Sequence, residues 1–86
     1  MPAFVYILKD SNDAIYVGST DNLARRLRQH ALGHTQTTRN LDNPLLVLSQ
    51  EYDSLIQARK IERRIKALKR RDYIDRMVHE GRIRMR

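Results

Sequence analysis

The stretch that decides the fold is FVYILKDSNDAIYVGSTDNLARRLRQH, from Phe4 to His30. Its first run, Phe4–Leu8, is apolar and contains β-branched and aromatic residues, which favour a strand. Turn-forming residues then lead into a second short run, Ala14–Val17, so the sequence predicts a β-hairpin. Gly18 is expected to end the second strand.

A helix is predicted directly after the hairpin. Asp21 is in a position to cap a helix that begins near Asn22. Leu23 and Leu27, four residues apart, mark the face of this helix that is expected to be buried. Gly33 is suited to the left-handed conformation in which helices commonly end.

A third strand is predicted after a polar, turn-rich loop, His34–Asn43. Pro44 opens this strand, which runs from Leu45 to Ser49 or slightly further. Its nearly continuous apolar run predicts burial on both faces of the sheet.

Two helices are predicted in the rest of the chain. Asp53 or Ser54 caps the first, whose apolar stripe consists of Leu55, Ala58, Ile61, Ile65 and Leu68. The last helix, which Gly81 ends, is predicted from three apolar residues: Tyr73, Ile74 and Met77. The order is β-β-α-β-α-α, and three strands need helices to cover them. The sequence therefore predicts a single small α+β domain at 1–80, and a basic tail at 81–86 that is expected to be frayed.

The composition limits the kind of protein this can be. The chain has 86 residues and no cysteine, so neither a disulfide scaffold nor a cysteine-ligated zinc site can support a thin core. Its first residues lack the basic region and apolar run of a secretory signal peptide. No run approaches the roughly 18 apolar residues of a membrane span. We expect a soluble, cytoplasmic protein without a membrane partner.

Positive charge is concentrated in the second half of the chain. The whole chain has 17 Lys and Arg against 10 Asp and Glu, a net charge of +7. Residues 59–86 hold 12 of the basic residues and 4 of the acidic ones. Such a segment attracts polyanions such as nucleic acid, although a solvated helix face explains the charge alone equally well. Base stacking on this segment is not expected, because Tyr73 is its one aromatic residue.

Several familiar enzyme classes are excluded because their motifs are missing. The three glycines stand far apart, so the chain has no glycine loop that could bind phosphate. No HExxH or Cys/His pattern offers a zinc site, and no serine lies in a GxSxG turn.

Two tyrosines and a basic pair are the first candidates for chemistry. Tyr6 and Tyr16 lie on the two hairpin strands, where each alone is best interpreted as a packing residue. An odd number of connecting residues would place both on one face of the sheet. Arg26 and His30 share a helix face. The simpler interpretation of Arg26 is a solvated surface charge, and that of His30 is a cation at the helix C-terminus.

Glu62 is the candidate carboxylate. It lies beside the apolar stripe of the long helix, and its simplest interpretation is a pair with Lys66, four residues later. With the tyrosines, Arg26 and His30 it also forms a set that permits phosphodiester hydrolysis. Glu62 would hold Mg²⁺, Arg26 would stabilise the phosphate, and a phenol or imidazole would take a proton from water. The residues permit this arrangement without requiring it.

Four blocks, in this order, resemble the motifs of the GIY-YIG nuclease superfamily: VYI at Val5–Ile7, YVG at Tyr16–Gly18, LARRLRQH at Leu23–His30 and ARKIERRIK at Ala58–Lys66. The likeness runs from about Phe4 to Lys69 and is greatest to small stand-alone bacterial members. These are similar to the N-terminal nuclease domain of the excision-repair protein UvrC. Ser19 stands where some members carry a lysine after the glycine.

The resemblance implies the GIY-YIG endonuclease fold, a three-stranded antiparallel sheet flanked by helices. It also implies hydrolysis of DNA that depends on Mg²⁺ or Mn²⁺, with Glu62 as the metal ligand. Tyr6 and Tyr16 are then the active-site tyrosines, one of them the general base. Arg26 stabilises the phosphate, and His30 assists the water or the phosphate. Gly18 would allow close backbone approach.

Our first hypothesis is therefore a DNA endonuclease, in repair or processing, that acts on nicked, branched or single-stranded forms. The alternatives are a non-catalytic module that binds nucleic acid, and a subunit that contributes its site to a larger complex. A protein partner would supply DNA specificity if the helices do not. The residues expected to contact nucleic acid are Arg25, Arg28, Arg39, Arg63, Arg64, Lys66, Lys69, Arg70 and Arg71.

Overall fold

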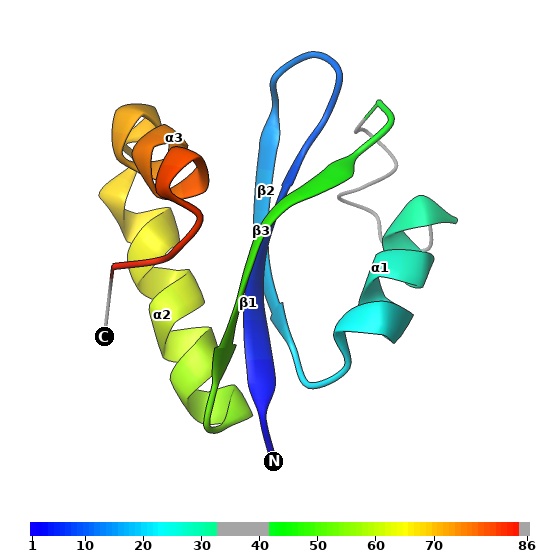
Figure 1. Cartoon of the computed structure of the whole chain (residues 1–86), viewed down its shortest axis with the longest axis vertical. Coiled ribbons are helices and arrows are strands. Elements are labelled where there is room, and N and C mark those ends of the chain that lie inside the picture. The colour runs from blue at the N-terminus through cyan, green and yellow to red at the C-terminus, as the bar shows by residue number, and fades with distance from the viewer. Residues whose placement is uncertain (33–41, 85–86) are drawn as a thin grey trace.

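A three-stranded antiparallel sheet stands in the middle of the molecule, with β1 between β2 and β3 (Figure 1). The strands are β1 (Ala3–Lys9), β2 (Ile15–Thr20) and β3 (Leu45–Tyr52). The computed structural model describes residues 1–32 and 42–84. The predictions for Gly33 and Arg39, and for most of the loop at 34–43, lie outside the described residues.

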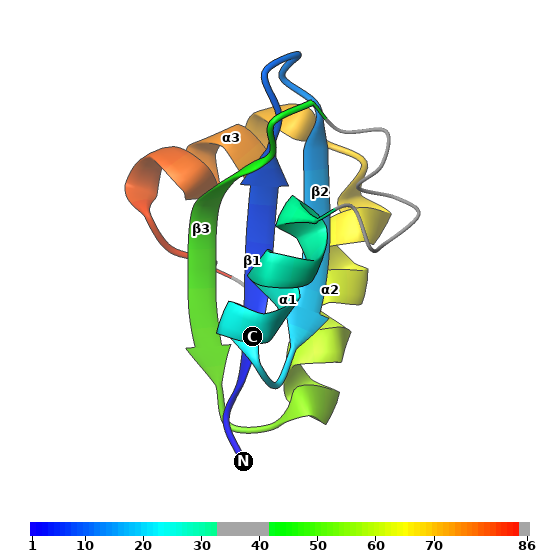
Figure 2. The same cartoon turned by 90° about the vertical axis from the view of Figure 1, so that its right-hand side faces the viewer.

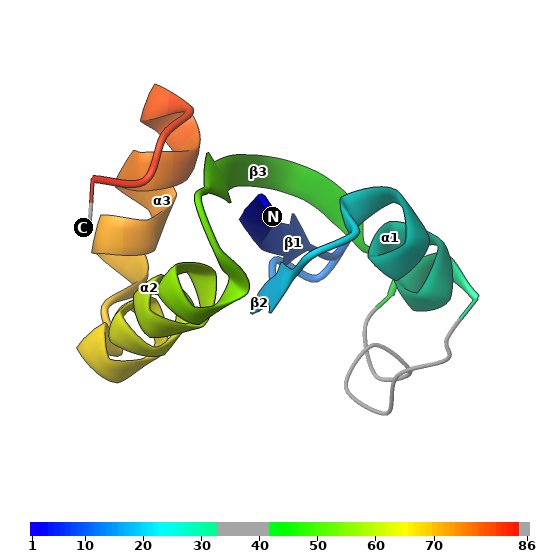
Figure 3. The ribbon, with the colours of Figure 1, turned by 90° about the horizontal axis from the view of Figure 1, so that it is seen from below.

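Helices cover both faces of the sheet. They are α1 (Leu23–Ala31), α2 (Leu55–Leu68) and α3 (Arg71–Glu80). Seen from below, α1 lies on one side of the sheet and α2 and α3 lie on the other (Figure 3). The predicted α+β class, the element order and the antiparallel sheet are confirmed.

The core lies between the sheet and α2. Val5 and Ile7 of β1 are completely buried, as are the predicted stripe residues Ala58, Ile61 and Ile65 of α2. The stripe works because these residues recur every three or four positions and so share one face of the helix. Its predicted ends, Leu55 and Leu68, are half-buried.

The hairpin register brings the two tyrosines together. Tyr6 pairs with Gly18 and Leu8 pairs with Tyr16, so both tyrosines lie on the same face, where both contact His30 of α1. Asp10 sets this register: its Oδ1 accepts hydrogen bonds from the backbone N–H groups of Asn12, at 3.0 Å, and Ala14, at 2.7 Å. These bonds lower the pKa of Asp10, the one from Ala14 having the largest effect.

Two predictions about the second strand and the first helix are wrong by a residue or two. The strand continues through Gly18 to Thr20, because β1 still pairs with it there. Asn22, not Asp21, caps α1: its extended backbone lets its side chain accept a hydrogen bond from the N–H of Arg25 at 3.0 Å. Asp21 instead lies 3.8 Å from the Arg25 guanidinium.

The prediction that β3 is buried on both faces is also wrong. Leu45 is 70% exposed and Leu46 is 41% exposed, whereas Leu48 and Tyr52 are buried. β3 is an edge strand, and its pairing with β1 shifts register after Ile7, so its first residues do not follow the inward alternation of the rest.

Residues 82–84 are not frayed as expected. Ile83 is 4% exposed and belongs to the core. Gln50 of β3 holds it on both sides, accepting from the Ile83 N–H at 2.7 Å and donating to its carbonyl at 3.2 Å. Residues 85–86 of the expected tail lie outside the described part of the chain.

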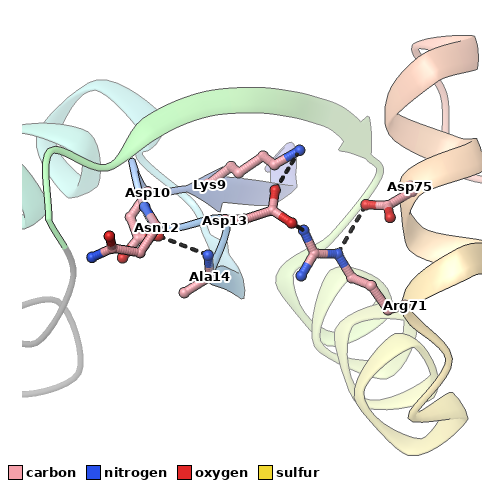
Figure 4. A network of polar contacts seen from close by, with 7 residues as sticks. All are labelled: Lys9, Asp10, Asn12, Asp13, Ala14, Arg71 and Asp75. Atoms are coloured by element: carbon pink, nitrogen blue, oxygen red, sulfur yellow. Dashed lines mark hydrogen bonds and ion pairs between the residues drawn. The ribbon is translucent and has the colours of Figure 1, made fainter.

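Arg71, at the start of α3, ties that helix to the hairpin turn (Figure 4). Its guanidinium lies 3.0 Å from Asp13, in the turn, and 2.9 Å from Asp75, one helical turn further along α3. Asp13 has a left-handed backbone, with φ of 70°, and also pairs with Lys9 at 2.9 Å.

Candidate active site

The predicted catalytic side chains other than His30 converge at the β2 edge of the sheet, where both α1 and α2 contribute residues. A cavity of about 430 Å³ lies there. It is lined from β1 and β2 by Tyr6, Tyr16, Gly18 and Ser19, from α1 by Arg26, and from α2 by Arg59, Glu62, Arg63 and Lys66. Four elements, β1, β2, α1 and α2, therefore form one site.

The rings of Tyr6 and Tyr16 form one wall of this site, and the His30 ring packs against both. The Tyr6 hydroxyl lies 2.7 Å from Nε2 of His30, which comes from α1. The Tyr16 ring lies edge-on to His30, with centroids 5.0 Å apart, and 6.1 Å from the Tyr6 ring. His30 is 3% exposed and does not line the cavity, so it supports the tyrosines from behind.

Gly18 makes room for the Tyr6 ring. A Cβ atom at Gly18 would lie 2.5 Å from the Tyr6 hydroxyl oxygen and 2.6 Å from its Cζ. Atoms cannot approach this closely, so a side chain at this position would displace the ring. The close approach predicted for Gly18 is present, and the group that approaches is Tyr6.

Glu62 is half-buried and held at both oxygens. Ser19 donates a hydrogen bond to its Oε1, and the Lys66 ammonium lies 2.7 Å from its Oε2. The same ammonium lies 5.9 Å from the centre of the Tyr16 ring. The predicted pair with Lys66 is confirmed, and the carboxylate also faces the cavity.

Burial changes the pKa of two of these aromatic residues, Tyr6 and His30. It raises the pKa of Tyr6 well above its usual range, and the nearby Tyr16 adds to this effect. Burial also lowers the pKa of His30, with the charge of Arg26 as a second cause. Tyr6 is therefore a protonated phenol at neutral pH, and His30 is a neutral imidazole rather than a cation at a helix end.

The chain matches a known family. Residues 2–75 match the GIY-YIG catalytic domain. The chain belongs to the GIY-YIG family. This family is of the nuclease type, which implies a nucleic-acid substrate, and its model covers every residue of the cavity.

Relatives with the same domain are small bacterial proteins. A UPF0213 protein of Citrobacter koseri is 32% identical over 81 residues, which are 93% of this chain and 80% of that protein. One from Vibrio cholerae is 41% identical over 69 residues, 78% of this chain and 68% of that protein. The solution NMR structure of UPF0213 protein BH0048 from Bacillus halodurans has a TM-score of 0.59 and 30% identity, covering 94% of this chain and 87% of the other. The match confirms the GIY-YIG fold.

Two residues of this GIY-YIG cavity were not predicted from the sequence. Ser19 follows Gly18 on β2, and alternation along the strand turns its side chain toward α2 and Glu62. Arg59 precedes Glu62 by three residues, and this spacing places both on one face of α2. No sequence pattern pointed to Ser19. Arg59 could have been found from the sequence, because its three-residue spacing from Glu62 places it on the same helix face.

The basic residues predicted to bind nucleic acid are distributed over several surfaces. Arg63 and Lys66 line the cavity, while Lys69, Arg70 and Arg71 line a neighbouring groove. Those that are exposed away from both are Arg25, Arg28 and Arg64. Arg70 pairs with Asp72 at 2.8 Å, so at least one of these exposed cations already has a counter-charge.

No helix in the described part of the chain is long and apolar enough to cross a membrane. The described residues also contain no cluster of three or more His, Cys, Asp or Glu side chains that could hold a metal together. Glu62 is the one carboxylate among the residues that line the cavity.

Proposed function

We propose that this protein is a metal-dependent endonuclease that hydrolyses phosphodiester bonds in DNA. The observation that carries the proposal is the convergence of Tyr16, Arg26 and Glu62 on one cavity in a GIY-YIG domain. A phenol, a guanidinium and a carboxylate supply a proton acceptor, a partner for phosphate charge and a metal ligand.

Arg26 and Tyr16 take the roles closest to the reacting phosphate. Arg26 reaches the cavity from α1, where its guanidinium can stabilise the charge that develops on the phosphate oxygens. Tyr16 is half-exposed in the cavity, so it can lose its own proton to solvent and, as a phenolate, accept a proton from an attacking water. Tyr6 is buried and has a raised pKa, which suits a residue that positions Tyr16 and remains protonated.

Glu62 fits a single hard cation, Mg²⁺ or Mn²⁺. Such an ion accepts one protein carboxylate and completes its shell with water and substrate oxygens, so a cavity with one carboxylate is sufficient. Lys66 already places a positive charge 2.7 Å from the same carboxylate, so Glu62 lies where a cation can approach it. When bound, the ion would stabilise charge on the leaving oxygen. Ser19 would orient the carboxylate through its hydrogen bond.

We further propose that the substrate is nicked, branched or single-stranded DNA, and that the protein acts in repair or processing in the cytoplasm. A role similar to that of the UvrC nuclease domain fits this proposal. The basic surface of α2 supplies part of the affinity for DNA, and a protein partner would supply the rest.

A non-catalytic nucleic-acid-binding module is the second candidate. The observation that favours it is the pairing of Glu62 with Lys66, because an ammonium takes the position that a metal ion would need. In that case the cavity would bind a phosphate without cleaving it.

The test is nicking of supercoiled plasmid and of branched DNA by the purified protein with and without Mg²⁺ or Mn²⁺. We expect Arg26→Ala to slow nicking by about a hundredfold or more, and Glu62→Gln to abolish the nicking that Mg²⁺ or Mn²⁺ supports. Arg76→Ala and Glu51→Gln remove the same charges from exposed positions outside the cavity and should leave nicking unchanged.

Nicking that survives both cavity substitutions would mean that a contaminating nuclease is responsible. Salt-sensitive DNA binding without nicking, at any concentration of either metal, would establish the second candidate instead.

A further inference from the structure

A second groove, of about 410 Å³, lies along β2 on the side toward the hairpin turn. Its apolar part consists of Ile15, Val17, Ile65 and Ile74. Its basic part consists of Lys66, Lys69, Arg70 and Arg71. We refer to it as the basic groove.

The basic groove continues directly from the candidate active site. Tyr16 and Lys66 line both cavities, Tyr16 from β2 and Lys66 from α2. β2 is an edge strand, and α2 packs along it (Figure 2), so the groove follows the open edge of the sheet. A polymeric ligand with one monomer at the candidate active site can therefore place its next monomers in the basic groove.

The charge of the basic groove is suited to an anion. None of the residues that line it in the described chain is acidic. Arg70 and Arg71 are partly compensated, because their guanidinium groups pair with exposed aspartates outside the lining. Lys69 makes no ion pair among residues 1–32 and 42–84, so its charge is available to a ligand.

The apolar residues of the basic groove favour an unpaired nucleic-acid strand over a duplex. In a duplex the bases are stacked and paired, so only phosphates and groove edges could reach the groove. An unpaired strand can turn its bases and sugars toward apolar side chains while its phosphates face the cations. Aliphatic side chains beside a row of cations match this second arrangement.

We propose that the basic groove binds the unpaired strand that adjoins the phosphate at the candidate active site. This inference rests on the proposed function, since it names the form of substrate on which the nuclease acts. It makes the preferred substrate a junction at which a single strand leaves a duplex.

The test measures binding without any divalent metal, by fluorescence anisotropy of a labelled duplex with and without an unpaired thymidine extension. We expect the extension to tighten binding at least about threefold. Lys69→Asn should remove this gain and lower the salt slope of log Kd by about 0.7, the value for one phosphate contact of a single strand. Asparagine is chosen because Lys69 has a left-handed backbone, with φ of 50°, which asparagine tolerates.

Two controls separate the groove from charge in general. Lys60→Gln removes one exposed positive charge of α2 outside the groove and should retain the gain from the extension. An abasic extension carries the same phosphates without bases, and it should bind about twofold more weakly than the thymidine extension, retaining part of the gain. Equal binding of the two extensions, or the same loss in both lysine variants, would overturn the proposal.

The outcome is distinguishable from that of the proposed function. Binding that depends on Lys69 and on the extension, in a protein that nicks no DNA, would support the groove and refute the nuclease. Nicking that depends on Glu62 but is indifferent to the extension and to Lys69→Asn would support the nuclease and refute the groove.

Discussion

Gly18 faces the Tyr6 ring across the β1–β2 pair, and the space between them admits no side chain. Its backbone is ordinary strand, so glycine is required here by the neighbouring ring and not by its own dihedral angles. The site therefore depends on the absence of one carbon atom.

We predict that Gly18→Ala destabilises the protein by about 1–3 kcal/mol, the usual cost of forcing extra volume into a packed site. Nicking should fall with it, because the displaced Tyr6 also moves Tyr16. Urea unfolding and the plasmid assay measure the two effects.

Gly81→Ala is the matched control. Gly81 has a φ of +77° and open space around its Cα, so alanine there strains the backbone without touching the site. It should lower stability by about 1–2 kcal/mol and leave the nicking rate of the folded protein unchanged. Equal loss of activity in both variants would contradict the role given to Gly18.

His30 gives the protein a pH-dependent stability. Its pKa in the fold lies below the usual 6.5, because burial disfavours the imidazolium. As pH falls below about 6.5 the unfolded chain takes up a proton before the folded chain does. Stability is therefore complete above this pH and is lost as pH falls toward the pKa of His30 in the fold.

We predict that the melting temperature falls between pH 7.5 and pH 5, and that His30→Gln reduces the size of this fall. Circular dichroism melts at each pH measure it. His79→Gln changes an exposed histidine of α3 and should retain the slope of the unmodified protein. An unchanged slope in His30→Gln would show that other groups cause the pH dependence.

At the scale of elements, the segment after α3 closes the core. Ile83 is buried, and Gln50 of β3 forms hydrogen bonds with both its backbone N–H and its carbonyl. This short segment therefore acts as a strap that links α3 to β3.

We predict that Ile83→Ala lowers the free energy of unfolding by about 2 kcal/mol or more, the cost of a cavity in a packed core. Ile56→Ala is its control, because Ile56 is 81% exposed and should change stability by less than about 0.5 kcal/mol. Urea unfolding of both variants checks the prediction. Equal effects would mean that Ile83 adds nothing to the core.

The helices were easier to predict from the sequence than the strands. The stripe around Ile61 is visible because a helix needs only its own residues to define a buried face. The exposure of Leu45 and Leu46 depends on which strand lies beside β3, and no local pattern carries that information. The cap at Asn22 rather than Asp21 depends on backbone dihedral angles that either residue could adopt.

The residues of the candidate site that could be predicted are those that belong to the four sequence motifs. Tyr6, Tyr16, Arg26 and Glu62 do meet in space. His30 was placed at the water or phosphate, and its position behind Tyr6 follows from packing between α1 and the sheet. That it assists the water or the phosphate stays a prediction, to be tested by activity.

At the scale of the whole molecule, the basic residues that cluster in the second half of the sequence also gather on one part of the surface. The basic residues of α2 and the α2–α3 junction line two adjoining hollows at the β2 edge. The charge alone did not distinguish a solvated helix face from a binding surface. The fold adds an apolar lining and a carboxylate to those cations, and this combination is what favours the proposed binding surface.

The contact between Ser19 and Glu62 joins residues that are 43 positions apart, and the one between Tyr6 and His30 spans 24. The tyrosines and the arginine are synthesised first, and the carboxylate arrives only with α2. For the activity proposed here, a nascent or partly unfolded chain is consequently inert. The proposed cutting would begin only when α2 has docked on β2, so its onset would report that these two elements have come together.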